Sequence, residues 1–274
     1  PILSRNTRSN NDTSMDIVIP QIKDAYSLIV ASSDENFTPP PFDDFYVDGV
    51  YQNPSTAGFL NGEVVDLRDL LYGMMLPSGN DAATTVAISL ASSLKNFSLM
   101  MNKKAKEIGM LNSSFANPHG LDDEDHYTTA KDLARVGAEL MENTILKEIV
   151  STYKKTFTYG ERVRTYINHN KLLRLYEGGI GIKTGFTKRS GRCLVGAAER
   201  DGMTFISVTL DAPSDWSDHR VMLDFAFDNF ERIELCGKGD LFAEVYYQGK
   251  KVGEGCRKAQ SRQIQPPEKH GKHR

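Results

Sequence analysis

The sequence predicts an α+β fold, in which an antiparallel sheet with flanking helices is joined to a helical lobe. Two observations predict it. Between positions 67 and 141 the apolar residues recur at helical spacing, whereas between positions 156 and 210 they alternate with period two. A second helical stretch, from about Ser217 to Phe230, follows the strands, and we expect it to lie on the sheet.

The chain of 274 residues is long enough for one sizeable domain and an appendage, and it shows three segments of unequal pattern. Residues 1–54 are poorly patterned, with short strands conceivable at 17–19 and 27–30. Residues 55–235 carry the regular pattern and form the predicted main domain. Residues 236–274 are expected to begin a small β-rich domain and to end in a basic tail.

Four helices are expected in the helical lobe. The first ends at Pro77 and has one apolar face, made of Leu67, Leu70, Leu71, Met74 and Met75. Asp81 is expected to cap the second helix, whose apolar stripe consists of Val86, Ala87, Leu90, Ala91 and Leu94. Ser98 is expected to cap a third helix that ends at Gly109, and Thr129 begins the fourth with a capping-box-like sequence.

The strands are expected to form two hairpins. Residues 156–159 and 163–166 flank a Gly-Glu pair, which is a hairpin signal. Residues 193–198 and 203–210 flank an Asp-Gly pair, which suits a type I′ turn. A further β-rich part of the chain runs from Leu241 to Tyr247 and then from Gly249 to Val252.

Composition and charge exclude several classes of protein. The formal net charge is −3, but the last 19 residues hold six lysines and arginines and one glutamate. We expect this end to be a solvated tail rather than a nucleic-acid-binding segment. Cys193, Cys236 and Cys256 have neither metal-ligand nor disulfide-framework spacing, so they do not fix the redox compartment. No metal and no cofactor are expected. No apolar run reaches membrane-spanning length, and we expect neither a membrane span nor a signal peptide within this chain.

Two short motifs about a hundred residues apart carry the candidate chemistry. In Ser-Gly-Asn at 78–80, the hydroxyl of Ser78 can relay a proton and the amide of Asn80 can hold a peptide group. In Lys-Thr-Gly at 183–185, Lys183 offers a cation and Thr184 a hydroxyl to a carboxylate, and Gly185 allows close approach of another backbone. Each motif alone is also ordinary local structure, but the combination suits recognition of an anionic peptide end.

The sequence around these motifs resembles the low-molecular-mass penicillin-binding proteins, the serine D-Ala-D-Ala carboxypeptidases of bacterial cell-wall maturation. The resemblance extends from about Gly58 to Leu235, roughly two-thirds of the chain. It is carried in order by residues 68–73 with 76–83, 101–105, 117–122, 127–134 and 179–187. It implies a β-lactamase/transpeptidase-like fold and makes residues 55–235 a carboxypeptidase-like catalytic domain.

The resemblance also implies a mechanism and a set of site residues. In the family a serine attacks the carbonyl between two D-alanines, the terminal D-Ala leaves, and water hydrolyses the acyl-enzyme. The implied site residues are Ser78, Asn80, Lys183, Thr184, Gly185 and Phe186. Ser78 assists proton transfer, Asn80 binds the peptide amide, and Lys183 and Thr184 hold the terminal carboxylate. The backbone N–H of Phe186 forms half of the oxyanion hole.

The same resemblance implies partners and a location. The substrate is a peptidoglycan stem peptide ending in D-Ala-D-Ala, β-lactams bind if a nucleophile exists, and the protein works outside the cytoplasmic membrane. His119 is expected to order its loop rather than to act as a catalytic base. Arg220 follows the sheet where some relatives place a carboxylate-binding arginine, although its register matches poorly.

One departure from the family pattern concerns the nucleophile. The family's Ser-x-x-Lys motif is expected near positions 13–18, yet no serine before Ser78 has a lysine three residues on. Thr13 or Ser14 with Asp16 is a conceivable substitute. Two hypotheses explain the departure: an inactive family member that at most binds peptidoglycan peptides, or a truncated or frameshifted product. A class A β-lactamase is a third alternative, with its deacylating acid among residues 122–125.

Overall fold

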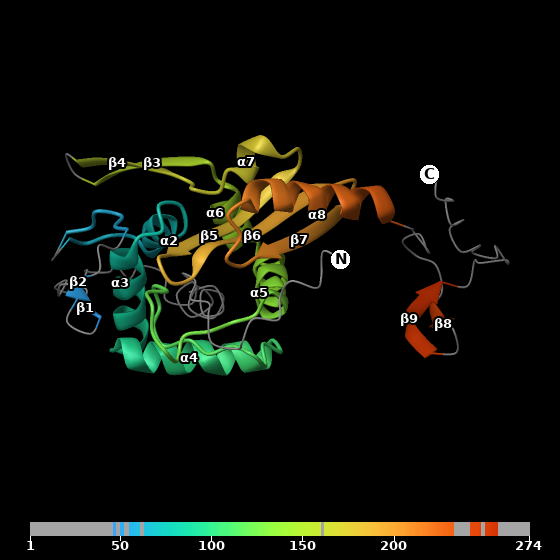
Figure 1. The fold of residues 1–274 in the computed structure, drawn as a ribbon, viewed down its shortest axis with the longest axis horizontal. Helices are drawn as coiled ribbons and strands as arrows, with labels where there is room; N and C mark the ends of the chain where they lie inside the picture. Colours follow the sequence, from blue (N-terminus) through green and yellow to red (C-terminus); the bar gives the residue numbers. More distant parts are fainter. Residues whose placement is uncertain are drawn as a thin grey trace. The chain divides into compact units, whose positions relative to one another are not determined.

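The computed structural model describes residues 46–47, 50–51, 55–60, 63–159, 162–232, 242–247 and 250–256. The chain divides into two units, Pro1–Phe230 and Glu231–Arg274. The first unit contains helices and antiparallel strands, which confirms the predicted α+β class (Figure 1). In the second unit β8 (Phe242–Tyr247) pairs with β9 (Lys250–Cys256) in an antiparallel hairpin.

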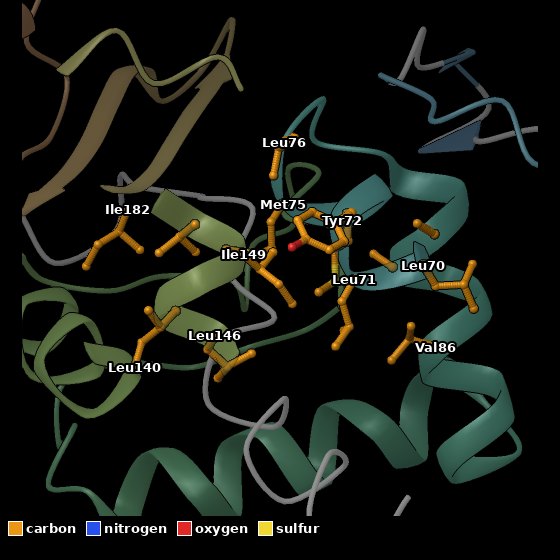
Figure 2. Packing of buried hydrophobic residues seen from close by; sticks show 14 of the residues in the cluster. Leu70, Leu71, Tyr72, Met75, Leu76, Val86, Leu140, Leu146, Ile149 and Ile182 are labelled. Carbon is orange, nitrogen blue, oxygen red and sulfur yellow. The ribbon is translucent and has the colours of Figure 1, made fainter. Parts of the chain in front are cut away.

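The described helices of the lobe are α2 (Leu67–Met75), α3 (Asn80–Ala91), α4 (Leu94–Glu107), α5 (Ala130–Glu142) and α6 (Thr144–Ser151). All five residues of the apolar face predicted for the first helix are buried. Figure 2 shows Leu70, Leu71 and Met75 packed with Val86 of α3 and Ile149 of α6. Helix α6 was not predicted, because it is only eight residues long and follows α5 after Asn143.

Side-chain caps decide where several of these helices begin. Asp66 accepts a hydrogen bond from the Arg68 N–H at 2.7 Å at the start of α2. Thr129 caps α5, as predicted, by accepting from the Asp132 N–H at 3.2 Å. Gly109 follows the end of α4 in the left-handed region, with φ of 82°, and confirms the predicted end of that helix.

Two predicted caps are wrong. Helix α3 already begins at Asn80, so Asp81 lies inside its first turn, and the carboxylate of Asp81 binds the backbone of a distant segment instead. Ser98 lies inside α4, because Ser93 caps that helix by accepting from the Asn96 N–H at 3.1 Å. The Ser98 hydroxyl donates to the Ala116 carbonyl at 2.7 Å and ties α4 to the following loop.

The sheet of the first unit consists of β5 (Gly179–Thr187), β6 (Gly191–Arg200) and β7 (Met203–Thr209), which are antiparallel neighbours in that order. The Asp-Gly turn between β6 and β7 has φ of 51° at Asp201 and 73° at Gly202, as the type I′ prediction requires. The predicted strands 193–198 and 203–210 are therefore confirmed. The short helix α7 (Leu172–Leu175) precedes β5 and was not predicted.

The sheet lies between two helical layers, and alternate residues of β6 face them. Cys193, Val195 and Ala197 belong to the large core shared with the helical lobe. Leu194 and Ala198 belong to a second cluster together with Leu223 of α8 (Asp215–Asn229). Helix α8 thus lies on the sheet, as predicted for the final helix, and it covers the face opposite the lobe (Figure 1).

Two small hairpins complete the described strands. β3 (Lys154–Tyr159) and β4 (Arg162–Ile167) pair with each other at the predicted place, and β1 (Tyr46–Val47) pairs with β2 (Val50–Tyr51). The strands conceived at 17–19 and 27–30 lie outside the described residues. Among the helices that are described, none is both long and apolar enough to cross a membrane.

Candidate active site

The Ser-Gly-Asn motif forms a tight turn between α2 and α3. Ser78 has a φ of 60°, which side-chain-bearing residues rarely adopt, and Asn80 is the first residue of α3. A Cβ at Gly79 would lie 2.7 Å from both the Ala57 Cβ and the Gly73 carbonyl oxygen, so only glycine fits there. Ser78 and Asn80 are both buried. The turn therefore holds a hydroxyl and an amide in fixed positions at the end of a helix.

The Lys-Thr-Gly motif lies in the middle of β5. Lys183 pairs with Val195 and Thr184 with Leu194 on β6, so β6 occupies one edge of this strand. Lys183 and Gly185 are buried, Thr184 is half-buried, and Phe186 is exposed. The strand thus carries a buried cation, and the next two side chains, Thr184 and Phe186, are the more accessible ones.

The two motifs meet across a contact between residues 105 positions apart. The Lys183 Nζ donates to the Ser78 Oγ at 2.7 Å and to the carbonyl oxygen of Thr184 at 2.7 Å. Both Ser78 and Lys183 line a cavity of about 10 Å³, together with Met74, Met75, Gly79, Asn80, Ala83, Pro118 and His119. Such a volume holds about one water molecule. A hydroxyl and an ammonium therefore meet beside Asn80, at a space that fits one small polar group.

A loop after α4 supplies the third wall of the cavity through Pro118 and His119. The His119 Nδ1 accepts from the Leu121 N–H at 3.3 Å, so this residue orders its loop as predicted. Burial first, and the nearby His126 second, lower the pKa of His119 to about 4. The imidazole is therefore neutral at pH 7, and the Leu121 contact leaves its proton on Nε2.

This loop is attached to the strand that carries Lys183. The Thr187 hydroxyl, at the end of β5, donates to the Asp122 carboxylate at 2.9 Å. The next three acidic residues, 123–125, are exposed. None of the acids at 122–125 lines the cavity around Ser78, so the described site offers no support for a deacylating acid there.

Arg220 does not join the Ser78 site. It lies exposed on α8 beside a separate cavity of about 230 Å³, whose other lining residues are Leu172, Leu175, Tyr176, Trp216 and Ser217. A different arginine, Arg192, lies opposite Phe186 on β6 and forms a 2.9 Å ion pair with the buried Asp215. The periodicity of β6 gave no signal for this pair, because its partners are 23 residues apart.

Two Ser-x-x-Lys spacings occur after Ser78, at Ser92–Lys95 and Ser151–Lys154. Ser92 and Lys95 are exposed around the end of α3, and the Ser151 hydroxyl donates to the Ile180 carbonyl oxygen at 2.6 Å. Neither pair lines the cavity that Lys183 shares with Ser78. Thr13, Ser14 and Asp16 lie outside the described residues.

Comparisons with known proteins agree on one family. Residues 46–214 match the family described as D-alanyl-D-alanine carboxypeptidase. The chain is 34% identical over 188 residues to the D-alanyl-D-alanine carboxypeptidase DacF of Bacillus subtilis, covering 67% of this chain and 48% of DacF. It is 35% identical over 198 residues to the D-alanyl-D-alanine carboxypeptidase of Streptomyces sp. strain K15, covering 66% of this chain and 68% of that protein. This chain thus spans about half the length of DacF.

Solved structures have the same fold. The crystal structure of the Streptomyces K15 DD-transpeptidase superimposes with a TM-score of 0.61 at 29% identity and covers 83% of each chain. A penicillin-binding protein homologue from Mycobacterium tuberculosis gives a TM-score of 0.69 at 24% identity, covering 82% of this chain and 87% of the other. The fold is therefore that of the penicillin-binding proteins, as the sequence resemblance implied.

Proposed function

The chain belongs to the D-alanyl-D-alanine carboxypeptidase family, and from this membership we propose that it acts on peptidoglycan stem peptides ending in D-Ala-D-Ala. The proposed reaction removes the terminal D-Ala through an acyl-enzyme, outside the cytoplasmic membrane. The observation that carries the proposal is the contact of Lys183 with Ser78 beside Asn80, because it joins the family's two binding motifs around one cavity.

Each proposed role follows from the chemistry of the side chain. Lys183 supplies the positive charge, and Thr184 the hydroxyl, that a terminal carboxylate needs. The Asn80 amide can both accept from and donate to a peptide group. The Ser78 hydroxyl accepts from Lys183, so it can pass a proton between that lysine and the reacting group.

Gly185 and Phe186 complete the proposed substrate contacts. Gly185 has no side chain, so the peptide backbone can lie close to β5 at this position. The backbone N–H of Phe186 then serves as one oxyanion-hole donor for the carbonyl under attack. Arg192 on β6 pairs with Phe186 along one edge of β5. The peptide would lie along the other edge of β5, which faces away from β6.

An inactive family member that only binds such peptides is the alternative function. One specific observation favours it: no serine before Ser78 is followed by lysine at the third position. The carboxylate and amide contacts proposed above do not need the nucleophile. Binding therefore survives in this alternative, whereas release of D-Ala and acylation by β-lactams do not.

Incubation with diacetyl-L-Lys-D-Ala-D-Ala separates the two functions. We expect free D-Ala to appear in proportion to time and enzyme, measured by chromatography. An intact-mass spectrum after benzylpenicillin should show a gain of one drug molecule, and peptide mapping of the adduct identifies the nucleophile. Binding of the peptide by calorimetry without D-Ala release and without a mass gain would establish the inactive alternative. Absence of both binding and release would overturn the proposed function.

A further inference from the structure

Asp81 is a buried carboxylate one residue beyond the proposed peptide-binding Asn80. It is 3% exposed and accepts three backbone N–H groups of a segment more than twenty residues away. The Ala57 N–H donates to Oδ1 at 2.8 Å, and the N–H groups of Gly58 and Phe59 donate to Oδ2 at 2.9 and 3.1 Å. Hydrogen bonds to a charged acceptor are about twice as strong as neutral ones. The first turn of α3 is therefore firmly attached to residues 57–59.

The same segment contacts the Ser-Gly-Asn turn directly. The Asn80 N–H donates to the Ser55 carbonyl oxygen at 2.9 Å. A Cβ at Gly79 would lie 2.7 Å from the Ala57 Cβ and 2.8 Å from the Asp81 Oδ1, so the turn is packed against both groups. A displacement of the segment from Asp81 would therefore remove the surface that holds this turn.

The other side of the segment is fixed by the hairpin. The Tyr166 hydroxyl on β4 donates to the Ala57 carbonyl oxygen at 2.8 Å. Arg164, on the same strand, donates to the Gly58 carbonyl oxygen at 3.0 Å. The backbone of Ala57 thus lies between a carboxylate of α3 and a hydroxyl of β4. With both sides held, the segment acts as a rigid support for the turn.

We propose that Asp81 is a positioning residue, which fixes the Ser78 hydroxyl and the Asn80 amide for peptide recognition by holding residues 57–59 against the turn. The inference rests on the proposed function, because it assigns Ser78 and Asn80 to the bound peptide. It adds a residue outside the two motifs, at which no local sequence signal indicates a role in recognition. Asp81 itself contacts neither the peptide nor Lys183.

The test compares Asp81→Asn with a charge-matched control, Asp218→Asn, on the exposed side of α8. The asparagine keeps the shape of Asp81 but turns one acceptor into an NH₂ group that faces backbone N–H donors. The affinity for diacetyl-L-Lys-D-Ala-D-Ala is measured by calorimetry, or as KM from initial rates if the chain releases D-Ala, at a temperature where circular dichroism shows every variant to be folded. We expect Kd to rise about tenfold or more in Asp81→Asn, and to be unchanged in Asp218→Asn. An unchanged Kd in a destabilised Asp81→Asn would show a merely structural role and overturn the inference.

Two further measurements keep the inference testable. If Asp81→Asn does not fold, Tyr166→Phe is measured in its place, because this variant removes only the hydroxyl on the other side of Ala57. We expect its Kd to be about threefold higher than that of the unmodified chain. An unchanged Kd contradicts the inference. If the unmodified chain binds no peptide, the proposed function fails, and the inference is judged without ligand. The side-chain amide resonances of Asn80, assigned with Asn80→Asp, should then shift in Asp81→Asn and stay in place in Asp218→Asn. Resonances that stay in place in both variants would overturn it.

Discussion

The contact between Lys183 and Ser78 joins two distant stretches of chain into one site. Ser78 belongs to the helical lobe, and Lys183 belongs to the sheet. Lys183 is 3% exposed, and such burial is unfavourable for an ammonium unless acceptors surround it. The Ser78 hydroxyl and the Thr184 carbonyl oxygen meet that requirement at 2.7 Å each. The buried ammonium therefore lies at the boundary of the helical lobe and the sheet, where we propose that the anionic end of the peptide binds.

Replacement of Lys183 by glutamine tests this charge. Lys183→Gln keeps a polar side chain but removes the cation, so we expect the Kd for diacetyl-L-Lys-D-Ala-D-Ala to rise at least about tenfold. Lys188→Gln is the matched control, because Lys188 is exposed just beyond the same strand. Calorimetry at two salt concentrations measures both variants. Equal losses of affinity in the two variants would show that general surface charge, rather than the buried cation, attracts the peptide.

At the scale of elements, the hairpin of β3 and β4 supports the site from outside the three-stranded sheet. Arg164 on β4 forms a 2.6 Å ion pair with Glu63, and both side chains are largely buried. Hydrogen bonding to Arg164 is the main reason that the pKa of Glu63 lies below its ordinary value. The hairpin thus holds both ends of the segment between Ala57 and Glu63, which in turn contacts the Ser-Gly-Asn turn.

Removal of the guanidinium at Arg164 tests the attachment of the hairpin. Arg164→Met leaves Glu63 buried without its partner, so we expect the free energy of unfolding to fall by about 2 kcal/mol. Lys154→Met, at an exposed position of β3 in the same hairpin, should change it by less than about 0.5 kcal/mol. Urea denaturation followed by circular dichroism measures both. Similar midpoints for the two variants would show that the ion pair does not secure the hairpin.

Across the whole molecule, local periodicity predicted most of the described elements but missed the short helices α6 and α7, and the resemblance pointed to the two motifs that the contact of Lys183 with Ser78 joins. The apolar face of α2 and the Asp-Gly turn between β6 and β7 could be read directly, because each depends on neighbours in sequence. The contacts of Asp81 could not be read in this way, because its three N–H donors lie 22 to 24 residues earlier in the chain. Judged by its sequence neighbours alone, Asp81 looks like a helix cap. The link from Thr187 to Asp122 joins residues 65 apart and has no periodic signal.

Acid should destabilise the whole molecule in two stages. The fold lowers the pKa of each group named below, so protonation of that group favours the unfolded chain. His219 is buried between the Ser207 and Thr209 hydroxyls, at 2.7 and 3.0 Å, and burial lowers its pKa to about 4. His119 has a pKa of about 4 for the same main reason. Both imidazoles stabilise the fold while neutral, so this stability is complete above the unfolded pKa of about 6.5 and is lost as pH falls toward 4. The lowered pKa of Glu63 adds a second loss below about pH 4.5.

His219→Gln tests the first stage, in which protonation of the buried imidazoles lowers the stability of the fold. With a folded pKa of about 4, His219 alone should account for about 2 kcal/mol of the stability lost between pH 7 and pH 5. Glutamine does not titrate in this range, so His219→Gln should start less stable at pH 7 and lose correspondingly less on acidification. Asn229→Gln is the control, because it changes an exposed residue of the same helix and neither adds nor removes a titratable group, so the wild-type pH dependence should stay intact. Urea denaturation at half-unit pH steps measures all three proteins. If His219→Gln loses as much stability as the wild type between pH 7 and pH 5, the buried imidazole of α8 does not set the acid limit of this fold.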